Sequence, residues 1–288
     1  MHDHAQVGMR PGSAFLAYRR ATHTIRQHIK WVASRFGVEV MTRRGLQDLE
    51  RGRCAAVDEY LRLLAKIRGT DLPESKDRID LLSRLRGAGV GEGAHLVACL
   101  VSVTRLPGDI CEFGVGSGAT SALLANELRG TGKVLWLYDT FAGLPAPTAE
   151  DELIDDVDQL GSMAAYQGRM SHAQAEVLDR LRNIGVSSEA FRIVTGLFDE
   201  TIADERLPEQ VCFAYVDFDF YAPIRAALEK LLPRMSPKGI IVVDDYGYFS
   251  NGAQKAVDQF LSAYPGLFEI EVPNYCHDKF AILRHVGR

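Results

Sequence analysis

Two pairs of carboxylates follow two apolar runs in the C-terminal half of the chain. Asp217 and Asp219 stand at alternate positions in YVDFDFY, and Asp244 and Asp245 are adjacent in VVDDY. A buried strand does not hold unpaired carboxylates, because each would lose its hydration without gaining a partner. Both pairs lie where a strand is expected to end, and side chains at the carboxyl ends of parallel strands line the ligand crevice of an open sheet.

The chemistry that suits four such acids is cation binding. Carboxylates gathered at one rim would repel one another and take up protons. A hard divalent cation removes this conflict, and ligands that are all oxygen atoms indicate Mg²⁺, Ca²⁺ or Mn²⁺ rather than zinc. The alternative is that each acid pairs with a basic residue or caps the following helix. That alternative suits a single acid, whereas two pairs on adjacent strands favour a cation.

A second candidate site is the glycine-rich stretch EFGVGSGAT, residues 112–120. Glu112 precedes the turn, where a carboxylate can receive the amino group of adenosylmethionine. Asp139 ends the next apolar run, 23 residues past Gly116, where an acid binds ribose hydroxyls. A dinucleotide site needs the same ribose acid, but Glu112 would repel its pyrophosphate. Glu112 could instead cap a helix or pair with an arginine. The cofactor contacts expected in the turn and at the start of the helix are Gly114, Gly116, Ser117, Gly118 and Ser121.

The elements that must position these residues alternate between short apolar runs and helical segments. Strands are expected at 109–115, 133–140, 191–196, 212–219, 239–246, 268–273 and 279–285, and helices at 119–129, 171–184, 222–234 and 252–263. This alternation predicts βαβ units and a parallel sheet. The link PNYCHD is too short for a crossover helix, so the last two strands should pair antiparallel. An α/β fold of seven strands, doubly wound and Rossmann-like, with an antiparallel C-terminal hairpin, is the layout of class I adenosylmethionine-dependent methyltransferases.

The first hundred residues show helical periodicity and lack a strand pattern. Helices are expected at 13–36, 46–68, 77–86 and 93–104, and the glycine-rich GAGVGEG between the last two should be a loop. We therefore expect a helical region over residues 1–105, which serves oligomerisation or acts as a lid, and a methyltransferase domain over residues 106–288.

Charge is distributed unevenly along the chain. Residues 1–53 carry ten Lys/Arg against four Asp/Glu, a balance of +6, and the remainder carries −11. The acidic body argues against nucleic-acid binding. The basic helices would either pack on the core or across a homo-oligomer, which we expect to be a dimer or larger, or dock to an anionic surface.

Composition excludes several other classes of protein. The chain has 288 residues, of which 47% are hydrophobic, and it lacks an uncharged apolar run of about 18 residues, so a membrane span is not expected. The N-terminal MHDHAQVGMRPG does not resemble a secretory signal. The five cysteines form no CxxC pair, and Cys111 and Cys212 lie in apolar runs, as buried thiols do. A cytoplasmic location is expected.

The motifs taken together resemble the macrocin O-methyltransferase family, which acts on antibiotic deoxysugars. The resemblance covers residues 107–264 and is most specific in DTFAGLPAPTAED and in the pair DFDFY and VVDDY. It implies transfer of a methyl group from adenosylmethionine to a sugar hydroxyl with the help of Mg²⁺. The acceptor would be a small molecule that bears a sugar, either a natural product or a glycan.

The resemblance also implies roles for individual residues. Asp217, Asp244 and Asp245 match the metal ligands, and Asp219 matches the residue proposed as general base, so that Asp217 and Asp219 form the catalytic pair. Glu112 and Asp139 match cofactor contacts, and Phe198 falls in the loop near the adenine. Five positions in three places differ from the usual family residues: Phe218 for Gly, Ala222-Pro223-Ile224 for Glu-Ser-Thr, and Gly116 for Trp. These differences leave the metal acids intact but affect the expectation for the acceptor.

Two other functions are consistent with the same motifs. A catechol-type methyltransferase shares the metal chemistry but acts on a flat aromatic diol, and a non-catalytic protein could use the fold for binding. The loop 142–170, which holds six acids in EDELIDDVD, and residues 70–105 are candidate lids, although the acid run could equally be a solvated loop. The patterns around His95 and His277 do not indicate a role for either.

Overall fold

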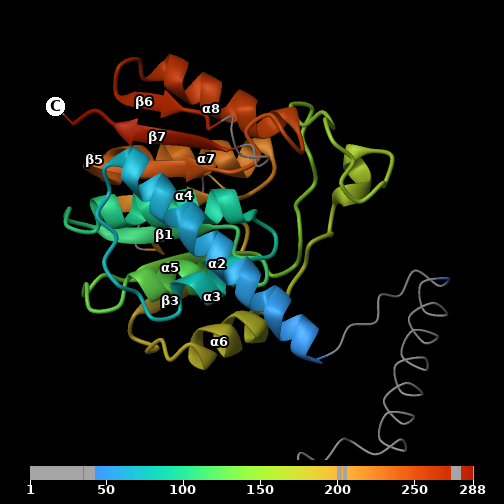
Figure 1. The fold of residues 1–288 in the computed structure, drawn as a ribbon. Coiled ribbons are helices and arrows are strands. Elements are labelled where there is room, and N and C mark those ends of the chain that lie inside the picture. The colour runs from blue at the N-terminus through green and yellow to red at the C-terminus, as the bar shows by residue number, and fades with distance from the viewer. Residues whose placement is uncertain (1–34, 36–42, 200–202, 204–205, 274–279, 288) are drawn as a thin grey trace, which may run out of the picture. The chain divides into compact units, whose positions relative to one another are not determined.

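The computed structural model describes residue 35 and residues 43–199, 203, 206–273 and 280–287. Contacts divide the chain into one unit of residues 1–53 and another of residues 54–288. The helix expected at 13–36, Cys276 and His277 lie outside the described residues. Within the described part of the chain, no helix is long and apolar enough to cross a membrane. The elements are labelled as in Figure 1.

The second unit is built on a seven-stranded sheet, as the sequence predicts. The strands are β1 Asp109–Phe113, β2 Leu135–Asp139, β3 Phe191–Thr195, β4 Val211–Val216, β5 Met235–Val243, β6 Phe268–Glu271 and β7 Ala281–His285. Their order across the sheet is β3-β2-β1-β4-β5-β7-β6. The first five strands run parallel, and β7 pairs antiparallel with both β5 and β6. The predicted class I methyltransferase sheet with its antiparallel C-terminal hairpin is confirmed.

Helices cover both faces of this sheet (Figure 1). The α-helices are α2 Arg43–Arg68, α3 Arg78–Ser83, α4 Val90–Val103, α5 Ala119–Glu127, α6 Gln174–Asn183, α7 Tyr221–Leu231 and α8 Asn251–Ala263. Apolar side chains of α7 and α8 form one buried core with the sheet, and those of α4, α5 and α6 form a second core on the opposite face. Strand β4 is buried along its whole length, because it lies in the middle of the sheet and is covered on both sides.

The strand period explains how β1 and β4 serve both cores. Cys111 faces the core of α7 and α8, whereas its neighbour Ile110 faces that of α4 and α5. Cys111 and Cys212 are 0% exposed thiols, which confirms the prediction that both are buried. Alternation in a central parallel strand places successive side chains in different layers, and both layers here exclude water.

The segment before β1 departs from expectation in one respect. Helix α4 begins at Val90, so the prediction of a loop through residue 93 is wrong for the second half of GAGVGEG. Gly93 lets this helix pack closely, because a Cβ there would lie 2.6 Å from Cδ2 of Leu85 and that side chain would have to shift. In α2, Leu61 and Leu64 are buried, whereas Ile67 near the end of the helix is 73% exposed.

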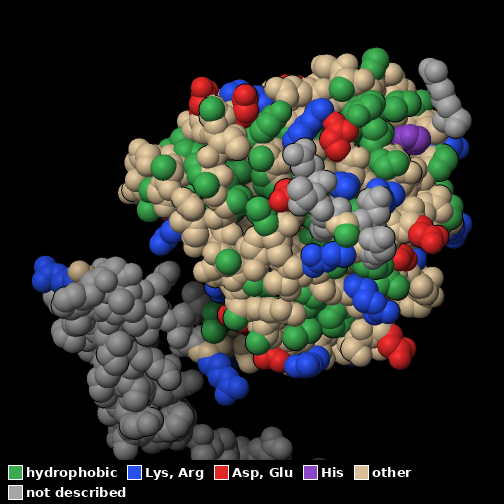
Figure 2. All heavy atoms as spheres, turned by 180° about the vertical axis from the view of Figure 1, so that it is seen from behind, with side chains coloured by type: hydrophobic (Ala, Val, Ile, Leu, Met, Phe, Trp, Pro, Cys, Tyr) green, Lys and Arg blue, Asp and Glu red, His purple; other side chains and the backbone are tan. Residues whose placement is uncertain are grey.

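Charged side chains are dispersed over the surface. Figure 2 shows Lys, Arg, Asp and Glu interspersed with apolar and neutral residues on the face seen from behind. Charged side chains also pair within single helices, such as Arg62 with Asp58 at 2.8 Å and Arg225 with Glu229 at 2.6 Å. Exposed pairs of this kind contribute at most about 1 kcal/mol each. The negative charge of the second unit is therefore not gathered into one patch on this face.

Candidate active site

A cleft of about 650 Å³ opens at the carboxyl ends of the parallel strands. Its walls include the turn after β1, Asp139 at the end of β2, and the segments that follow β3, β4 and β5. Residues from all the motifs that the sequence singles out therefore meet in one cavity. The sequence-predicted residues that line it are Gly114, Gly116, Ser117, Asp139, Phe198, Asp217, Asp219, Asp244 and Asp245.

The glycine turn is set by close approach of two backbone segments. Gly114 has a φ of 86°, and a Cβ on it would lie 1.7 Å from the carbonyl oxygen of Asp217. Only glycine can occupy this position, because both the dihedral angle and the space exclude a side chain. The turn after β1 thus lies directly against the segment that carries the first acid pair. Gly118, at a φ of 78°, packs similarly against Val177 of α6.

Asp139 is tied to the same turn. Its Oδ2 accepts hydrogen bonds from the backbone amides of Val115 at 2.7 Å and Gly116 at 2.9 Å. Its Oδ1 accepts from the amide of Phe141 at 2.7 Å. A carboxylate oxygen has two lone-pair sites, so Oδ1, which accepts one hydrogen bond, can still accept another from a ligand hydroxyl. Asp139 therefore shapes the turn and remains available at the wall of the cleft.

An aromatic group backs the cleft on the side of β1 and β2. The rings of Phe113 and Tyr138 stack at 4.7 Å, and Phe198 meets both edge-on. Phe218, the residue between the two acids, lies 5.8 Å from Phe113 and joins this group. Its ring therefore extends toward the segment after β3, where Phe198 lies.

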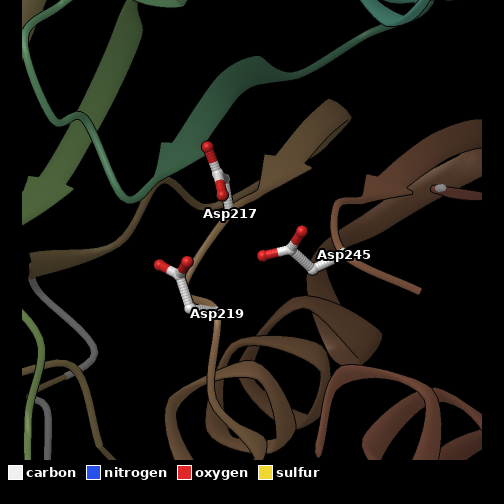
Figure 3. Close-up of side chains that lie close together, drawn as sticks. All are labelled: Asp217, Asp219 and Asp245. Atoms are coloured by element: carbon white, nitrogen blue, oxygen red, sulfur yellow. The ribbon is translucent and has the colours of Figure 1, made fainter. Parts of the chain in front are cut away.

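Three of the four acids surround one small space. Asp217, Asp219 and Asp245 each offer a carboxylate oxygen, and these atoms lie within 4.8 Å of one another. Figure 3 shows the three side chains arriving from the ends of two neighbouring strands. Oxygen ligands on opposite sides of one Mg²⁺ are about 4 Å apart, and those around Ca²⁺ about 5 Å. The donor atoms and their spacing thus fit one hard cation.

Two of these acids hold unusual backbone conformations. Asp219 has a φ of 60° and Asp245 a φ of 55°, in the left-handed region. Aspartate adopts this region more readily than most residues, but at a cost of the order of 1 kcal/mol. Strand β4 ends at Val216, so the first acid pair belongs to the turn after the strand, not to the strand itself as the range 212–219 implied. That turn directs both side chains toward the cleft.

The electrostatics of the cluster favour protonation or a cation. Withdrawal from water raises the pKa of Asp217, Asp219 and Asp245 well above the usual value, and repulsion from neighbouring carboxylates, Asp244 among them, raises it further. The hydrogen bond from Tyr215 opposes this rise at Asp217 without overcoming it. A positive charge among these groups would remove the repulsion and stabilise the ionised forms.

Asp244 takes a different orientation from the other three acids. Its Oδ1 accepts from the amide of Asp245 at 2.8 Å, and its Oδ2 contacts the hydroxyl of Tyr215 at 3.0 Å. The same hydroxyl lies 2.8 Å from Oε1 of Glu92, in the first turn of α4. Burial, followed by the adjacent carboxylates, raises the pKa of Tyr215 well above its usual value. Sequence reasoning missed both Tyr215 and Glu92.

Glu112 lies one layer behind the cleft. It is fully buried, and its carboxyl group accepts hydrogen bonds from the hydroxyls of Thr120 and Ser121, the latter at 2.5 Å. Burial raises the pKa of Glu112 to about 8, against the opposing effect of these hydroxyls. Thr120 lines the cleft, whereas Glu112, Ser121 and Gly118 are not among the residues of its wall. Any influence of Glu112 on a ligand would thus pass through Thr120.

Helix α6 contributes wall residues that the sequence did not indicate. Arg180 lines the cleft, and its Nε donates to the carbonyl oxygen of Ser117 at 3.1 Å. His172, two residues before α6, also lines the cleft, with its Cδ2 3.9 Å from where a Cβ of Gly116 would be. A basic residue on a helix carries no sequence signal of this kind, because its position depends on how α6 packs against the turn.

The acid run after β2 is only partly a solvated loop. Asp151 is 6% exposed and accepts hydrogen bonds from the amides of Tyr221 and Thr148, each at 2.7 Å. Asp156 accepts from the hydroxyl of Tyr166 at 2.6 Å. Val157 and Met170 of this segment line the cleft. The loop is thus attached to the start of α7, next to the acids, and forms one wall of the cavity.

His95, for which no role was predicted, is fully buried outside the cleft. Its ring meets that of Phe280 edge-on at 5.3 Å, and its Nδ1 lies 2.8 Å from Nη2 of Arg68. Burial and the adjacent arginine lower the pKa of His95 to about 4. A histidine held neutral in this way connects α4 to α2 and to Phe280, the residue before β7, and it does not line the cleft.

Comparison with known proteins gives the same family from sequence. Residues 92–265 match the model of the macrocin O-methyltransferase family. A similar curated protein is the 8-demethyl-8-(2,3-dimethoxy-alpha-L-rhamnosyl)-tetracenomycin-C 4'-O-methyltransferase of Streptomyces olivaceus, 27% identical over 59% of this chain and 65% of the relative. Another is the demethyldecarbamoylnovobiocin O-methyltransferase of Streptomyces niveus, 27% identical over 61% of this chain and 67% of the relative. The chain therefore spans about two thirds of the length of these relatives.

The fold is also found among solved structures. The O-methyltransferase NovP superposes with a TM-score of 0.60 at 20% identity, over 82% of this chain and 100% of NovP. At that identity the likeness concerns the fold alone. It supports the α/β fold described above.

Proposed function

Because the chain belongs to the macrocin O-methyltransferase family, we propose that it transfers a methyl group from adenosylmethionine to a sugar hydroxyl. The acceptor is a sugar or deoxysugar carried by a natural product or a glycan. The observation that carries the proposal is the meeting of two sites in one cleft: the glycine turn with Asp139, and the acids that follow β4 and β5.

Support for a sugar acceptor comes from the relatives. The name of the Streptomyces olivaceus protein places its reaction on a compound that bears a rhamnosyl group. The cleft is lined by both polar and apolar residues, with Tyr248 and Phe249 beside the acids and Val157 and Met170 from the loop after β2. Such a wall suits a small molecule that presents hydroxyls to the acids and an apolar surface to the loop.

The cofactor would lie along the turn after β1. Asp139 would bind the ribose hydroxyls, and Phe198 would lie beside the adenine. The backbone of Gly116 and Ser117 would contact the methionine portion, with Glu112 acting through Thr120, whose hydroxyl bonds to it. Arg180 adds a cation at the same turn and suits the cofactor carboxylate.

The acids would hold a divalent cation and the acceptor. Adenosylmethionine supplies an activated methyl group, and a bound Mg²⁺ lowers the pKa of hydroxyls that it coordinates. Asp217, Asp244 and Asp245 are proposed as the ligands. A carboxylate oxygen of Asp219 would then take the proton from the acceptor hydroxyl as the oxygen of that hydroxyl forms its bond to the methyl carbon. The bond between sulfur and methyl breaks, and adenosylhomocysteine leaves.

The protein would position the methyl donor relative to the acceptor and exclude water from the cleft. The contact between Gly114 and the backbone of Asp217 fixes the distance between the cofactor turn and the acids. The loop that carries Val157 and Met170 covers one side of the cavity. Holding acceptor and methyl donor in line converts a bimolecular step into one within a complex, which can supply several kcal/mol.

The test is a methyl-transfer assay with purified protein, adenosylmethionine and Mg²⁺. Acceptors should include a rhamnosyl or deoxysugar compound and a catechol of similar size, and adenosylhomocysteine release should be measured with and without EDTA. We expect release with the sugar acceptor and its loss with EDTA. Release with the catechol alone would indicate a catechol-type enzyme. If calorimetry detects no binding of adenosylmethionine, both the sugar and the catechol methyltransferase hypotheses are wrong.

A further inference from the structure

The hydroxyl of Tyr215 lies among three carboxylates. It is 2.8 Å from Oε1 of Glu92, 3.0 Å from Oδ2 of Asp244 and 3.2 Å from Oδ2 of Asp217. Tyr215 is 0% exposed and Glu92 is 1% exposed, so water does not compete strongly for these contacts. The phenol thus joins three segments of the chain that are far apart in sequence.

The fold explains why this one hydroxyl reaches both acid pairs. Tyr215 stands two residues before Asp217, so the strand period directs both side chains to the same face. Asp244 follows the neighbouring strand β5, and its amide donates to the carbonyl oxygen of Val216 at 2.9 Å. The two acids are therefore level with each other across the sheet, and the phenol lies beneath both.

A donor in this place constrains carboxylates that would otherwise rotate. The hydroxyl of Tyr215 contacts Oδ2 of both Asp217 and Asp244, and residues that bond to ligating groups orient them and tune affinity. A phenol has one hydrogen, so at any moment it donates to one of the three carboxylates, and its oxygen can accept from a carboxyl group that carries a proton.

We propose that Tyr215 is a positioning residue, which orients the carboxylates of Asp217 and Asp244 for a divalent cation, and that Glu92 holds its hydroxyl in place. The inference rests on the cation site of the proposed function. It gives α4 a part in the chemistry, because Glu92 belongs to the first turn of that helix. The helical segment before β1 is then attached to the site through one side chain.

The first test compares Tyr215→Phe with Tyr138→Phe. Tyr138 is also buried in a parallel strand of the sheet, but its hydroxyl donates to the backbone oxygen of Arg206 at 2.9 Å. Mn²⁺ binding to each purified full-length variant is measured by calorimetry and by electron paramagnetic resonance. We expect Tyr215→Phe to bind Mn²⁺ about 10- to 100-fold more weakly than the wild type and Tyr138→Phe to match it.

Four outcomes of this comparison support or overturn the role proposed for Tyr215. Unchanged Mn²⁺ affinity in Tyr215→Phe overturns the role proposed for Tyr215 but remains consistent with the proposed cation site. Equal weakening in both variants also overturns it, because the effect would then come from a loss of stability. Weakening confined to Tyr215→Phe supports it. If the wild type binds no Mn²⁺, the proposed cation site is wrong, and the role proposed for Tyr215 is wrong as well.

A second pair of variants keeps the inference testable if Tyr215→Phe does not fold. Glu92→Leu removes the polar group that holds the hydroxyl of Tyr215 in place, and Glu92→Gln retains one, because an amide can donate to or accept from that hydroxyl. We expect Glu92→Leu to lower Mn²⁺ affinity by about tenfold or more and Glu92→Gln to recover most of that loss. Equal affinities in the two variants would show that Glu92 does not act through its bond to Tyr215.

Discussion

The ring of Phe218 lies 5.8 Å from that of Phe198, tilted by 37°, so the residue between the two acids packs toward the segment after β3. From sequence, Phe218 was a departure from the family that affected the expectation for the acceptor. Its contacts with Phe113 and Phe198 place its ring among the aromatic side chains beside the turn after β1. The ring therefore supports the part of the cleft proposed for the cofactor.

Replacing Phe218 with alanine should weaken binding of adenosylmethionine. The change removes two ring contacts and lets Phe198 shift, which we expect to cost about 1–2 kcal/mol, or roughly tenfold in Kd. Calorimetric titration of the variant measures this directly. If Phe218→Ala retains its affinity for adenosylmethionine and instead raises KM for the acceptor, the ring belongs to the acceptor side of the cleft.

Asp139 should matter for the turn as well as for the cofactor. Both oxygens of Asp139 accept hydrogen bonds from backbone amides of the turn. In Asp139→Asn, one of these oxygens becomes an NH₂ group, which cannot accept. At least one backbone N–H therefore loses its acceptor. We expect the free energy of unfolding to fall by about 1–3 kcal/mol and adenosylmethionine affinity to fall with it. Urea denaturation and calorimetry measure the two effects. A loss of affinity without loss of stability would mean that the turn does not depend on Asp139.

The roles of Asp219 and Asp244 can be separated by experiment. If Asp219 is the base, Asp219→Asn should bind Mn²⁺ nearly as well as the wild type while kcat falls by about 10²- to 10⁴-fold. Asp244→Asn should lose Mn²⁺ affinity first. The geometry makes this a sharp test, because an oxygen of Asp219, not of Asp244, lies within 4.8 Å of those of Asp217 and Asp245. If Asp219→Asn loses Mn²⁺ binding and Asp244→Asn does not, Asp219 is the metal ligand and Asp244 is the candidate base.

The sheet and the acid pairs could be predicted because their signals are local. Apolar runs that end in Asp217 and Asp244 mark the strand ends, and the parallel order places those ends at one edge of the sheet. The turn at Gly114 is marked by its composition. In each case a few adjacent residues carry the information, and the fold adds only their proximity.

The residues that surround these motifs could not be predicted in the same way. Glu92 and Tyr215 are 123 positions apart, and their contact depends on how α4 lies across the sheet. Asp151 belongs to an acid run typical of a solvated loop, yet it is buried because the amide of Tyr221 needs an acceptor. Such contacts depend on tertiary packing, for which a single sequence carries no periodic signal.

Glu112 should make the stability of the metal-free protein depend on pH. Its pKa is about 8 in the folded state because burial disfavours the charged form, whereas an ordinary glutamate titrates near 4.5. The folded state therefore binds this proton more tightly than the unfolded state does. The contribution of this group to the free energy of unfolding is fully present below about pH 4.5 and is lost as the pH rises through 8.

Glu112→Gln isolates this contribution, because glutamine is close in shape, can bond to the hydroxyls of Thr120 and Ser121, and does not titrate. We expect the variant to gain stability relative to the wild type as the pH rises from 5 to 8, by an amount of the order of a few kcal/mol. Urea denaturation of both proteins at pH 5, 6.5 and 8, without cofactor or cation, gives the difference, and groups common to both largely cancel. Parallel curves would show that Glu112 is already ionised in the folded protein at pH 5. In that case its carboxylate would carry a full negative charge behind Thr120, which a cofactor amino group could use.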